Sequence, residues 1–358
     1  MDIFVLNQNF ETIDIIDNYE SLIWTDRYFE YGDFELYLPM QKHLLESLQK
    51  DNYLYIRDSE HVMIIEDFEI TTDAEIGSRL TVTGRSLESI LERRIIWGQK
   101  TYSGIIQAII KSMITDAIIS PEIESRKIDN FVFQDSSDES AEGDSVDLQF
   151  TGNNLYDSVS VLCKTIGAGF QVILDADNNF VFSLYSGRDR SYAQDANPYV
   201  VFSPSFENII DSRYVETNSS YRNVTLVAGE GEGSERKTIT VGDGNGLLRR
   251  ELFVDARDIS SQTQEGTLTD EQYNAQLTER GNERLQEYIA STAFEGKAET
   301  SRMFRYGEDF FMGDIVQITN EFGMESRARI TEIIRSQNEE GLAVYPTFET
   351  IDTEEKEE

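Results

Sequence analysis

Strands of alternating apolar and polar residues occur near both ends of this chain and recur at one spacing. Residues 24–38 carry apolar side chains at alternate positions, interrupted by Gly32-Asp33, a hairpin signal. Further strand-like segments follow at 53–56, 62–70 and 80–83, and a similar set lies between 314 and 349. Pairs of apolar residues lie 262 positions apart (316 − 54): Leu54 and Val316, Ile56 and Ile318, Leu80 and Leu342, and Val82 and Val344. The middle strands, 62–70 and 328–334, match only after a small shift. The pattern predicts two similar small β-barrels.

The residues between these two sets follow helical periodicity. Ser103 is expected to cap a helix whose apolar face is Ile106, Ile109, Ile110, Met113 and Ile114. Asn153 or Asn154 is expected to cap a second helix, which ends at Gly167 or Gly169. A hairpin of residues 170–174 and 180–184 follows it. Thr269 and Gln272 have the spacing of a capping box and predict a helix that continues to about residue 289.

The predicted fold class is therefore α+β and rich in β structure, with two small antiparallel β-barrel domains and inserted α/β and helical segments. The first barrel takes residues 1–98, and an inserted α+β domain takes 99–198. The second barrel takes 199–262 and 296–351, with a helical insert at 263–295. Residues 352–358 form an acidic tail.

The charge balance excludes several classes of partner. The chain of 358 residues has 67 acidic and 31 basic residues, a formal net charge of −36. Such a surface repels phosphate, so stable binding to nucleic acid or to anionic membranes is not expected. The excess acid either keeps the protein soluble or lines a surface that nucleic acid passes without sticking. No apolar run is long enough to span a membrane, the start lacks the features of a signal peptide, and a single cysteine, Cys163, fits a reducing cytosol.

No segment carries a convincing catalytic or metal-binding pattern. Residues 229–233 (GEGEG) lack the Lys-Ser/Thr ending of a phosphate loop. Asp175, Asp177 and Asn179 imitate the start of a calcium loop, but Phe180 stands where that loop needs glycine. Cys163 and His61 have no neighbouring partners that would activate a thiol or complete a metal site. We therefore predict no enzyme activity, no cofactor and no metal.

Several phrases occur in a recognisable order. They are Tyr31 to Leu36 (YGDFEL), Leu80 to Leu87 (LTVTGRSL), Arg93-Arg94, Asn154-Leu155, Tyr185 to Ser191 (YSGRDRS), Asn223 to Gly233 (NVTLVAGEGEG) and Gly246 to Ile259 (GLLRRELFVDARDI). In order and approximate spacing they resemble the siphophage minor tail proteins that form the tail-tip hub, a baseplate-hub-like family that also supplies the N-terminal part of larger tail-associated proteins.

The resemblance implies a structural subunit at the distal end of the tail of a virion, or of a tail-like particle such as a bacteriocin, made in the host cytoplasm. A ring of three chains would join a six-fold tail tube to a three-fold tip and form the channel for DNA passage. Implied partners are other copies in a homotrimer, a distal-tail or tube protein, the tape-measure protein and a tip or receptor-binding protein. Larger relatives carry a C-terminal lytic or receptor-binding extension. Because the chain ends at Glu358, we expect that activity to be absent or on another polypeptide.

The arginines within these phrases are candidate assembly contacts, because guanidinium groups pair with the abundant carboxylates. They are Arg85, Arg188, Arg190, Arg249 and Arg250. The alternative is that they form ordinary ion pairs. Gly84 and Gly187 are expected to supply backbone freedom at strand ends. The runner-up function is a receptor- or carbohydrate-binding module that uses Trp24 or Trp97, and a cell-wall hydrolase is the third class.

Overall fold

The computed structural model describes residues 1–75, 77–138, 141–263, 266–289, 291–298, 303–322 and 325–351. Only the backbone is described at 209–214, 234, 263 and 291–298. The predicted acidic tail at 352–358 lies outside these ranges. In the described helices, no segment is long and apolar enough to cross a membrane.

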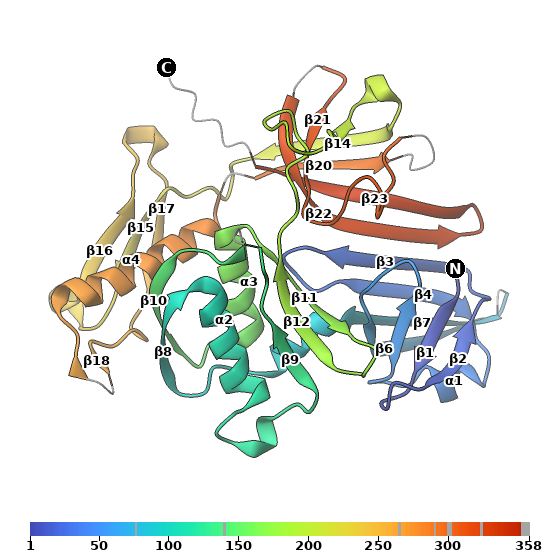
Figure 1. Cartoon of the computed structure of the whole chain (residues 1–358), viewed down its shortest axis with the longest axis horizontal. Helices are drawn as coiled ribbons and strands as arrows, with labels where there is room; N and C mark the ends of the chain where they lie inside the picture. Colours follow the sequence, from blue (N-terminus) through green and yellow to red (C-terminus); the bar gives the residue numbers. More distant parts are fainter. Residues whose placement is uncertain are drawn as a thin grey trace.

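One large sheet joins the two ends of the chain (Figure 1). It has 13 strands and is antiparallel except between β13 and β21. In spatial order the strands are β14 (Ile209–Thr217), β20 (Ser291–Ala298), β23 (Gly341–Thr350), β22 (Glu325–Asn338), β3 (Ser21–Arg27), β4 (Asp33–Pro39), β7 (Gly77–Ser86), β6 (Met63–Asp73), β5 (Tyr53–Ile56), β1 (Ile3–Leu6) and β2 (Thr12–Ile16), with β21 (Ile315–Thr319) on β22 and β13 (Val201–Phe202) on β21. The described pairing is an open path without a closed barrel. The β-rich α+β class is therefore confirmed, whereas the two barrels are not.

Five strands at each end are paired in the same order. We call β3, β4, β7, β6 and β5 the first β unit, and β14, β20, β23, β22 and β21 the second β unit. Residues opposite one another across the first unit are Trp24, Phe34, Gly84 and Ile65. The corresponding row in the second unit is Tyr214, Phe294, Phe348 and Ile330. Each unit also has an irregularity directly after the last residue of its row, between Ile65 and Asp67 and between Ile330 and Glu332.

The paired rows correct the register predicted from the sequence. Leu54 and Val316 do correspond. Leu54 pairs with β6 at a position two residues before Ile65, and Val316 pairs with β22 at a position two residues before Ile330. Gly84, however, corresponds to Phe348 at an offset of 264 (348 − 84). The predicted pairs Leu80 with Leu342 and Val82 with Val344 are therefore two residues out of register. A shift of two keeps every side chain on the same face of a strand, so the apolar pattern does not detect it.

The first insert covers β8 to β12 and packs beside the first β unit. Its strands are β8 (Gln99–Ile105), β9 (Phe131–Gln134), β10 (Ser145–Thr151), β11 (Gly169–Leu174) and β12 (Phe180–Tyr185), and its helices are α2 (Ile106–Ile114), η2 (Thr115–Ile119) and α3 (Leu155–Ile166). Asn154 caps α3 by accepting from two backbone amides, and Gly167 ends the helix with a positive φ of 68°. Ser103 lies within β8, so it does not cap α2 as predicted.

A separate layer forms from the second part of the chain. The sheet β16 (Thr238–Gly242), β15 (Val224–Ala228) and β17 (Glu251–Asp255) packs on α4 (Asp270–Gln286). Thr269 and Gln272 form the predicted capping box at the start of α4. These strands lie within the range predicted for the second barrel, yet they have their own core of Val227, Val254, Tyr273 and Leu277. Conversely, β20 lies partly in the range predicted for the helical insert and belongs to the large sheet.

The remaining short elements are α1 (Leu44–Ser47), η1 (Leu87–Arg93), η3 (Glu124–Arg126), η5 (Pro204–Phe206), η6 (Gly233–Glu235), η7 (Gly246–Leu248), β18 (Gln262–Thr263) and β19 (Gly266–Thr267).

Candidate functional site

The two β units meet where β22 pairs with β3, and this junction holds a buried ion pair. The Arg335 guanidinium lies 2.5 Å from the Asp26 carboxylate, and each side chain is 3% exposed. The Trp24 indole N–H donates to Asp26 at 3.1 Å, and the Ser59 hydroxyl donates to it at 3.0 Å. The carboxylate therefore has a full set of donors, which compensates for its removal from water.

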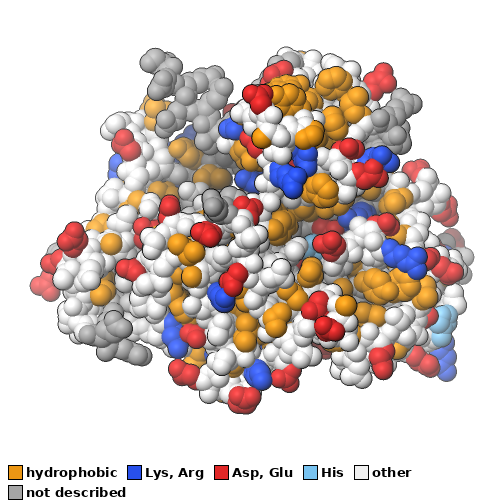
Figure 2. Space-filling model, in the orientation of Figure 1, with side chains coloured by type: hydrophobic (Ala, Val, Ile, Leu, Met, Phe, Trp, Pro, Cys, Tyr) orange, Lys and Arg blue, Asp and Glu red, His pale blue; other side chains and the backbone are white. Residues whose placement is uncertain are grey.

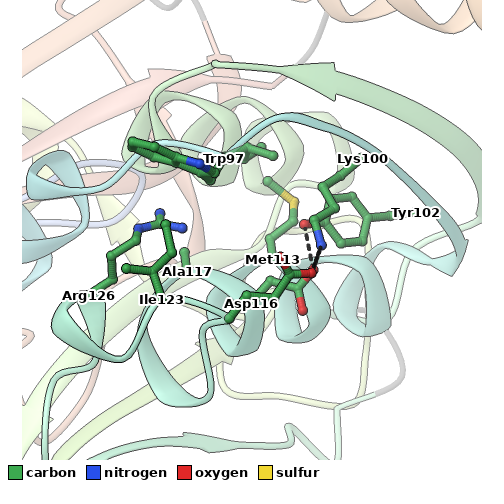
Figure 3. A pocket seen from close by; sticks show the side chains of 10 residues that line it. Trp97, Lys100, Tyr102, Met113, Asp116, Ala117, Ile123 and Arg126 are labelled. Carbon is green, nitrogen blue, oxygen red and sulfur yellow. Dashed lines mark hydrogen bonds and ion pairs between the residues drawn. The ribbon is translucent and has the colours of Figure 1, made fainter.

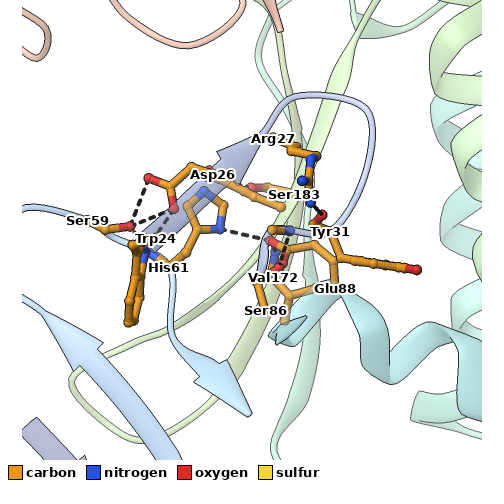
Figure 4. Close-up of polar contacts among 12 residues, drawn as sticks. Trp24, Asp26, Arg27, Tyr31, Ser59, His61, Ser86, Glu88, Val172 and Ser183 are labelled. Carbon is orange, nitrogen blue, oxygen red and sulfur yellow. Dashed lines mark hydrogen bonds and ion pairs between the residues drawn. The ribbon is translucent and has the colours of Figure 1, made fainter. Parts of the chain in front are cut away.

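A second carboxylate connects the same region to the insert (Figure 4). His61 Nδ1 lies 3.1 Å from Oε1 of Glu88, and the backbone N–H of Val172 donates to that oxygen at 2.8 Å. Burial disfavours the charged imidazole, but the charges of Glu88 and Asp26 and the hydrogen bond with Glu88 outweigh it and raise the pKa of His61 to about 9. His61 is therefore a buried cation at neutral pH, and it joins the loop before β6 to η1 and β11 in one network.

A third buried pair joins the insert to the second β unit. The Arg190 side chain donates to Asp314 at 2.6 Å, and these side chains are 8% and 2% exposed. Asp314 also accepts from the backbone N–H groups of Arg188 and Phe311. Beside this pair, a Cβ on Gly187 would lie 2.0 Å from the backbone of Gly313. Gly187 is thus required by close backbone contact, and not by the conformational freedom predicted from the sequence.

Of the other arginines singled out from the sequence, one lies in β7 and two lie next to each other before β17. Arg85 bonds to both oxygens of Glu66 at 2.6 and 2.8 Å and to Glu92 at 2.5 Å, and it covers the Tyr31 ring. Arg249 bonds to Glu251 on an exposed surface, and Arg250 donates to the carbonyl of Asn218. Arg85 and Arg190 make their contacts within the chain. For all five arginines, contact with another subunit stays a prediction.

The structure gives the remaining candidates ordinary structural roles. Cys163 is fully buried, and burial alone raises the pKa of its thiol. Asp175 accepts from the backbone N–H groups of Asp177 and Asn179 in the β11–β12 turn, as a plain hairpin turn would require. Residues 229–233 connect β15 to β16. The described residues contain no group of three or more His, Cys, Asp or Glu side chains able to hold a metal ion.

The tryptophans proposed for ligand binding differ in access. Trp24 is fully buried, so it cannot stack on a sugar. Trp97 is 57% exposed at a cavity of about 30 Å³, which is close to the volume of one water molecule (Figure 3). The Arg126 guanidinium lies 5.3 Å from the centre of the Trp97 ring. Lys100 and Tyr102 both contact Asp116 inside the cavity. This cavity is too small for a glycan, but Trp97 also lines a second cavity of about 710 Å³ between β8 and α4, together with Gln99 and Gln276.

The sequence phrases predicted several residues of these networks but not their partners. Arg190 and Gly187 lie in a phrase noted from the sequence, whereas Asp26, Asp314, Glu88 and Arg335 did not stand out. Among 67 acidic residues no single carboxylate is conspicuous, and the partners lie far apart in sequence.

Comparison with known proteins agrees with this architecture. The family model described as Siphovirus ReqiPepy6 Gp37-like protein matches residues 2–348. The structure is similar to the prophage tail protein gp18 from Listeria monocytogenes EGD-e, with a TM-score of 0.57, 13% identity, and coverage of 99% of this chain and 96% of that one. It is also similar to the 43 kDa tail protein of prophage MuSo2 from Shewanella oneidensis, with a TM-score of 0.58, 13% identity, and coverage of 97% and 98%. No curated protein matches the sequence.

Proposed function

This chain belongs to the Siphovirus ReqiPepy6 Gp37-like family of siphophage tail proteins, and on that premise we propose that it is the hub subunit at the distal end of the tail. Three copies form a ring that joins the six-fold tail tube to the three-fold tip and surrounds the channel for DNA. In this proposal each β unit is one of the two tube domains, and neighbouring chains complete the barrel-like wall.

The observation that supports this proposal most is the repeated pairing of the two β units. Both have the same five-strand order, the same register and an irregularity at the same place. A chain with two such units offers six similar units in a ring of three, which matches a six-fold tube on one side and three-fold symmetry on the other.

The acidic composition supports a channel that DNA passes without binding. Acidic side chains are spread over all parts of the face shown in Figure 2, among fewer basic ones. Like charge prevents the phosphate contacts that would have to break as DNA moves. We infer that part of the net charge of −36 faces the lumen. A ring structure with a neutral or basic channel would contradict this inference.

The proposed partners follow from the same position. A distal-tail or tube protein binds above the ring, a tip or receptor-binding protein binds below it, and the end of the tape-measure protein lies inside. Arg188, next to the Arg190–Asp314 pair, and Arg249, on the separate layer with α4, are the proposed assembly contacts that the described fold leaves exposed, whereas Arg250 is half-buried. The chain supplies structure in this proposal and no catalysis.

Electron-microscope class averages of the purified chain, alone and mixed with its neighbouring tail protein, test the proposal. We expect rings with three-fold symmetry, a central channel and six similar lobes. A chain that stays monomeric in both samples contradicts the ring. Glycan-array binding of that monomer through Trp97, abolished by Trp97→Ala, would instead support the receptor-binding function.

A further inference from the structure

The second half of β6 is an open sheet edge. β6 pairs with β7 along its whole length, from Met63 to Asp73. On its other side β6 pairs with β5 only at Met63 and Ile64. Beyond Ile65, no described strand pairs with that side of β6. The backbone groups of residues 67–72 on this side therefore have no neighbouring strand among the described ones and could pair with another strand.

The corresponding strand of the second β unit is fully paired. β22 has β23 on one side, and on its other side β21 pairs with residues 325–329. Its second half, residues 332–337, continues that side by pairing with β3 of the first β unit. Residues 67–72 of β6 correspond to 332–337 of β22 at the offset of 265 that relates Ile65 to Ile330. The open edge is thus the place where the first unit lacks the neighbour that the second unit has.

Side-chain burial differs between the two edges as this comparison predicts. Ile333 faces Asp26 of β3 across the junction and is fully buried. Phe68, at the corresponding position of β6, is 44% exposed, and Ile70 two residues later is 43% exposed. Phe68 and Ile70 lie opposite Val82 and Leu80, which are core residues, so they point to the core side of the sheet. Two large apolar side chains are exposed there because no strand covers them.

The strand that would fit this edge is β14. In the repeated order β14 corresponds to β3, because Tyr214 and Trp24 occupy the same place in the two rows. β3 has neighbours on both sides, β4 and β22. β14 pairs with β20 alone among the described strands and ends the sheet. The chain therefore has one open β6 edge and one open β14 edge, and the junction between β22 and β3 shows how such edges pair.

We propose that β6 of one chain pairs antiparallel with β14 of a second copy of this chain, in the register of the β22–β3 junction. Glu332 pairs with Arg27, Ile333 with Asp26 and Ile334 with Thr25 in that junction. The offsets between the two β units convert these three pairs into the expected pairs between copies. Asp67 then pairs with Thr217 of the second copy, Phe68 with Glu216 and Glu69 with Val215. The contact joins two different surfaces, one from each copy. Repeated copies therefore form a closed ring only if the rotation from one copy to the next divides a full turn evenly. The inference deepens the proposed function and rests on it.

The junction between copies lacks both ion pairs of the junction within the chain. Arg27 bonds to Glu332 at 2.6 Å within the chain, whereas Thr217 and Asp67 stand at the corresponding positions between copies. Ile70 stands where Arg335 stands, and Glu216 stands where Asp26 stands, so the buried ion pair is not reproduced. The contact between copies rests on backbone hydrogen bonds and on coverage of Phe68 and Ile70. When the copies separate, each chain should stay folded, because the contact between copies uses no ion pair that stabilises a single chain.

A register-specific disulfide tests the pairing in the full chain. Glu69→Cys combined with Val215→Cys places two thiols directly opposite each other between copies, within the range of Cβ distances that a disulfide spans. Glu69→Cys combined with Glu216→Cys is the matched control, because Glu216 lies one residue away and points to the other face of its strand. Cys163 is fully buried in both variants. Under mild oxidation we expect covalent dimers and trimers from the first variant only.

The outcomes separate this inference from the ring itself. Wild-type trimers, seen by native mass measurement, together with no cross-link from the first variant contradict the β6–β14 pairing and leave the ring standing. Equal cross-linking of both variants also contradicts the pairing, because it shows contact without register. A wild-type chain that is monomeric alone and with its neighbouring tail protein overturns the ring and the pairing with it.

A second measurement does not depend on cysteine chemistry. Phe68→Lys places a charge on the core side of the open edge, and we expect at least a tenfold weaker self-association. Ile15→Lys on β2, where Ile15 is 52% exposed, is the control and should leave association unchanged. Hydrogen exchange of the wild type should show protection of residues 67–72 and 212–217 that grows with oligomer fraction. Association that Phe68→Lys does not alter, with no added protection, contradicts the inference.

Discussion

The two β units have the same strand pairing and very different interiors. The core of the first unit is mainly aliphatic around Trp24, with side chains such as Leu22, Leu36 and Val82. The core of the second unit contains a cluster of aromatic rings among its aliphatic side chains, in which Phe202 contacts Phe310 and Phe348 at ring-centre distances of 5.3 and 4.9 Å. The pairing of the strands and the alternation of apolar with polar residues therefore define a β unit, while the side chains that fill its core vary.

The polar contacts differ more sharply than the cores. The junction from the second unit to the first contains the buried pair of Asp26 and Arg335, and the corresponding edge of the first unit carries Ile70 in place of the arginine. The first unit connects to the insert through His61 and Glu88, and the second through Asp314 and Arg190. Buried charges thus distinguish one junction from another where backbone pairing alone does not.

The largest effect is expected from breaking the charged junction on one side. Arg335→Met leaves the Asp26 carboxylate buried without its cation, and we expect the free energy of unfolding to fall by about 3–5 kcal/mol. Chemical denaturation measures this change. The double variant Asp26→Leu with Arg335→Met removes both charges and should recover most of the loss. A loss below about 1 kcal/mol in the single variant would show that the pair does not determine this junction.

The contact between the first unit and the insert should weaken as pH rises. The pKa of His61 is raised from 6.5 to about 9 in the folded protein. The stabilisation is therefore fully present below about pH 6.5 and is lost as the pH rises through 9, an effect of up to about 3 kcal/mol. Glu88, Asp26 and Arg335 surround the imidazole, and burial raises the pKa of nearby Tyr306 to about 12, above this window.

Unfolding free energy measured from pH 6 to 9 tests this expectation, with His61→Gln as the control. The variant should show a much flatter profile over this range. Equal pH dependence in wild type and variant would mean that another group carries it.

The contact between the second unit and the insert should tolerate no added carbon at Gly187. Gly187→Ala forces a Cβ against the Gly313 backbone, and overpacking of this kind costs about 1–3 kcal/mol. Ser186→Ala, at the adjacent residue, should change the unfolding free energy by less than about 0.5 kcal/mol. A shift of the thermal midpoint that is the same for both variants would contradict the close-contact explanation.

The smallest effect on folding is expected at the exposed arginines. Arg188→Ala and Arg249→Ala should each change the unfolding free energy by less than about 1 kcal/mol, because both side chains are exposed and exposed ion pairs contribute little. If they are assembly contacts, ring formation should nevertheless decrease. Sedimentation velocity separates the two effects. Unchanged assembly in both variants would remove these residues from the proposed interfaces.

Local sequence signals predicted the elements that depend on near neighbours. The capping box at Thr269, the cap at Asn154 and the hairpin after Gly167 are all formed as expected. Ser103 failed as a cap because it pairs in β8, since pairing with β10 satisfies its backbone instead. The recurrence of the strands was visible in sequence, but its register was misjudged by two residues at β7 and β23.

The sequence by itself determined the alternation of the strands, the caps of the helices and the strongly acidic charge, because each depends on residues close together or on composition alone. Only the tertiary structure decided which carboxylate meets which arginine. Asp26 and Arg335 are 309 positions apart, and Arg190 and Asp314 are 124 apart. It also decided which edge stays open. Phe68 and Ile333 belong to similar alternating strands, and only the path of the chain covers one and exposes the other.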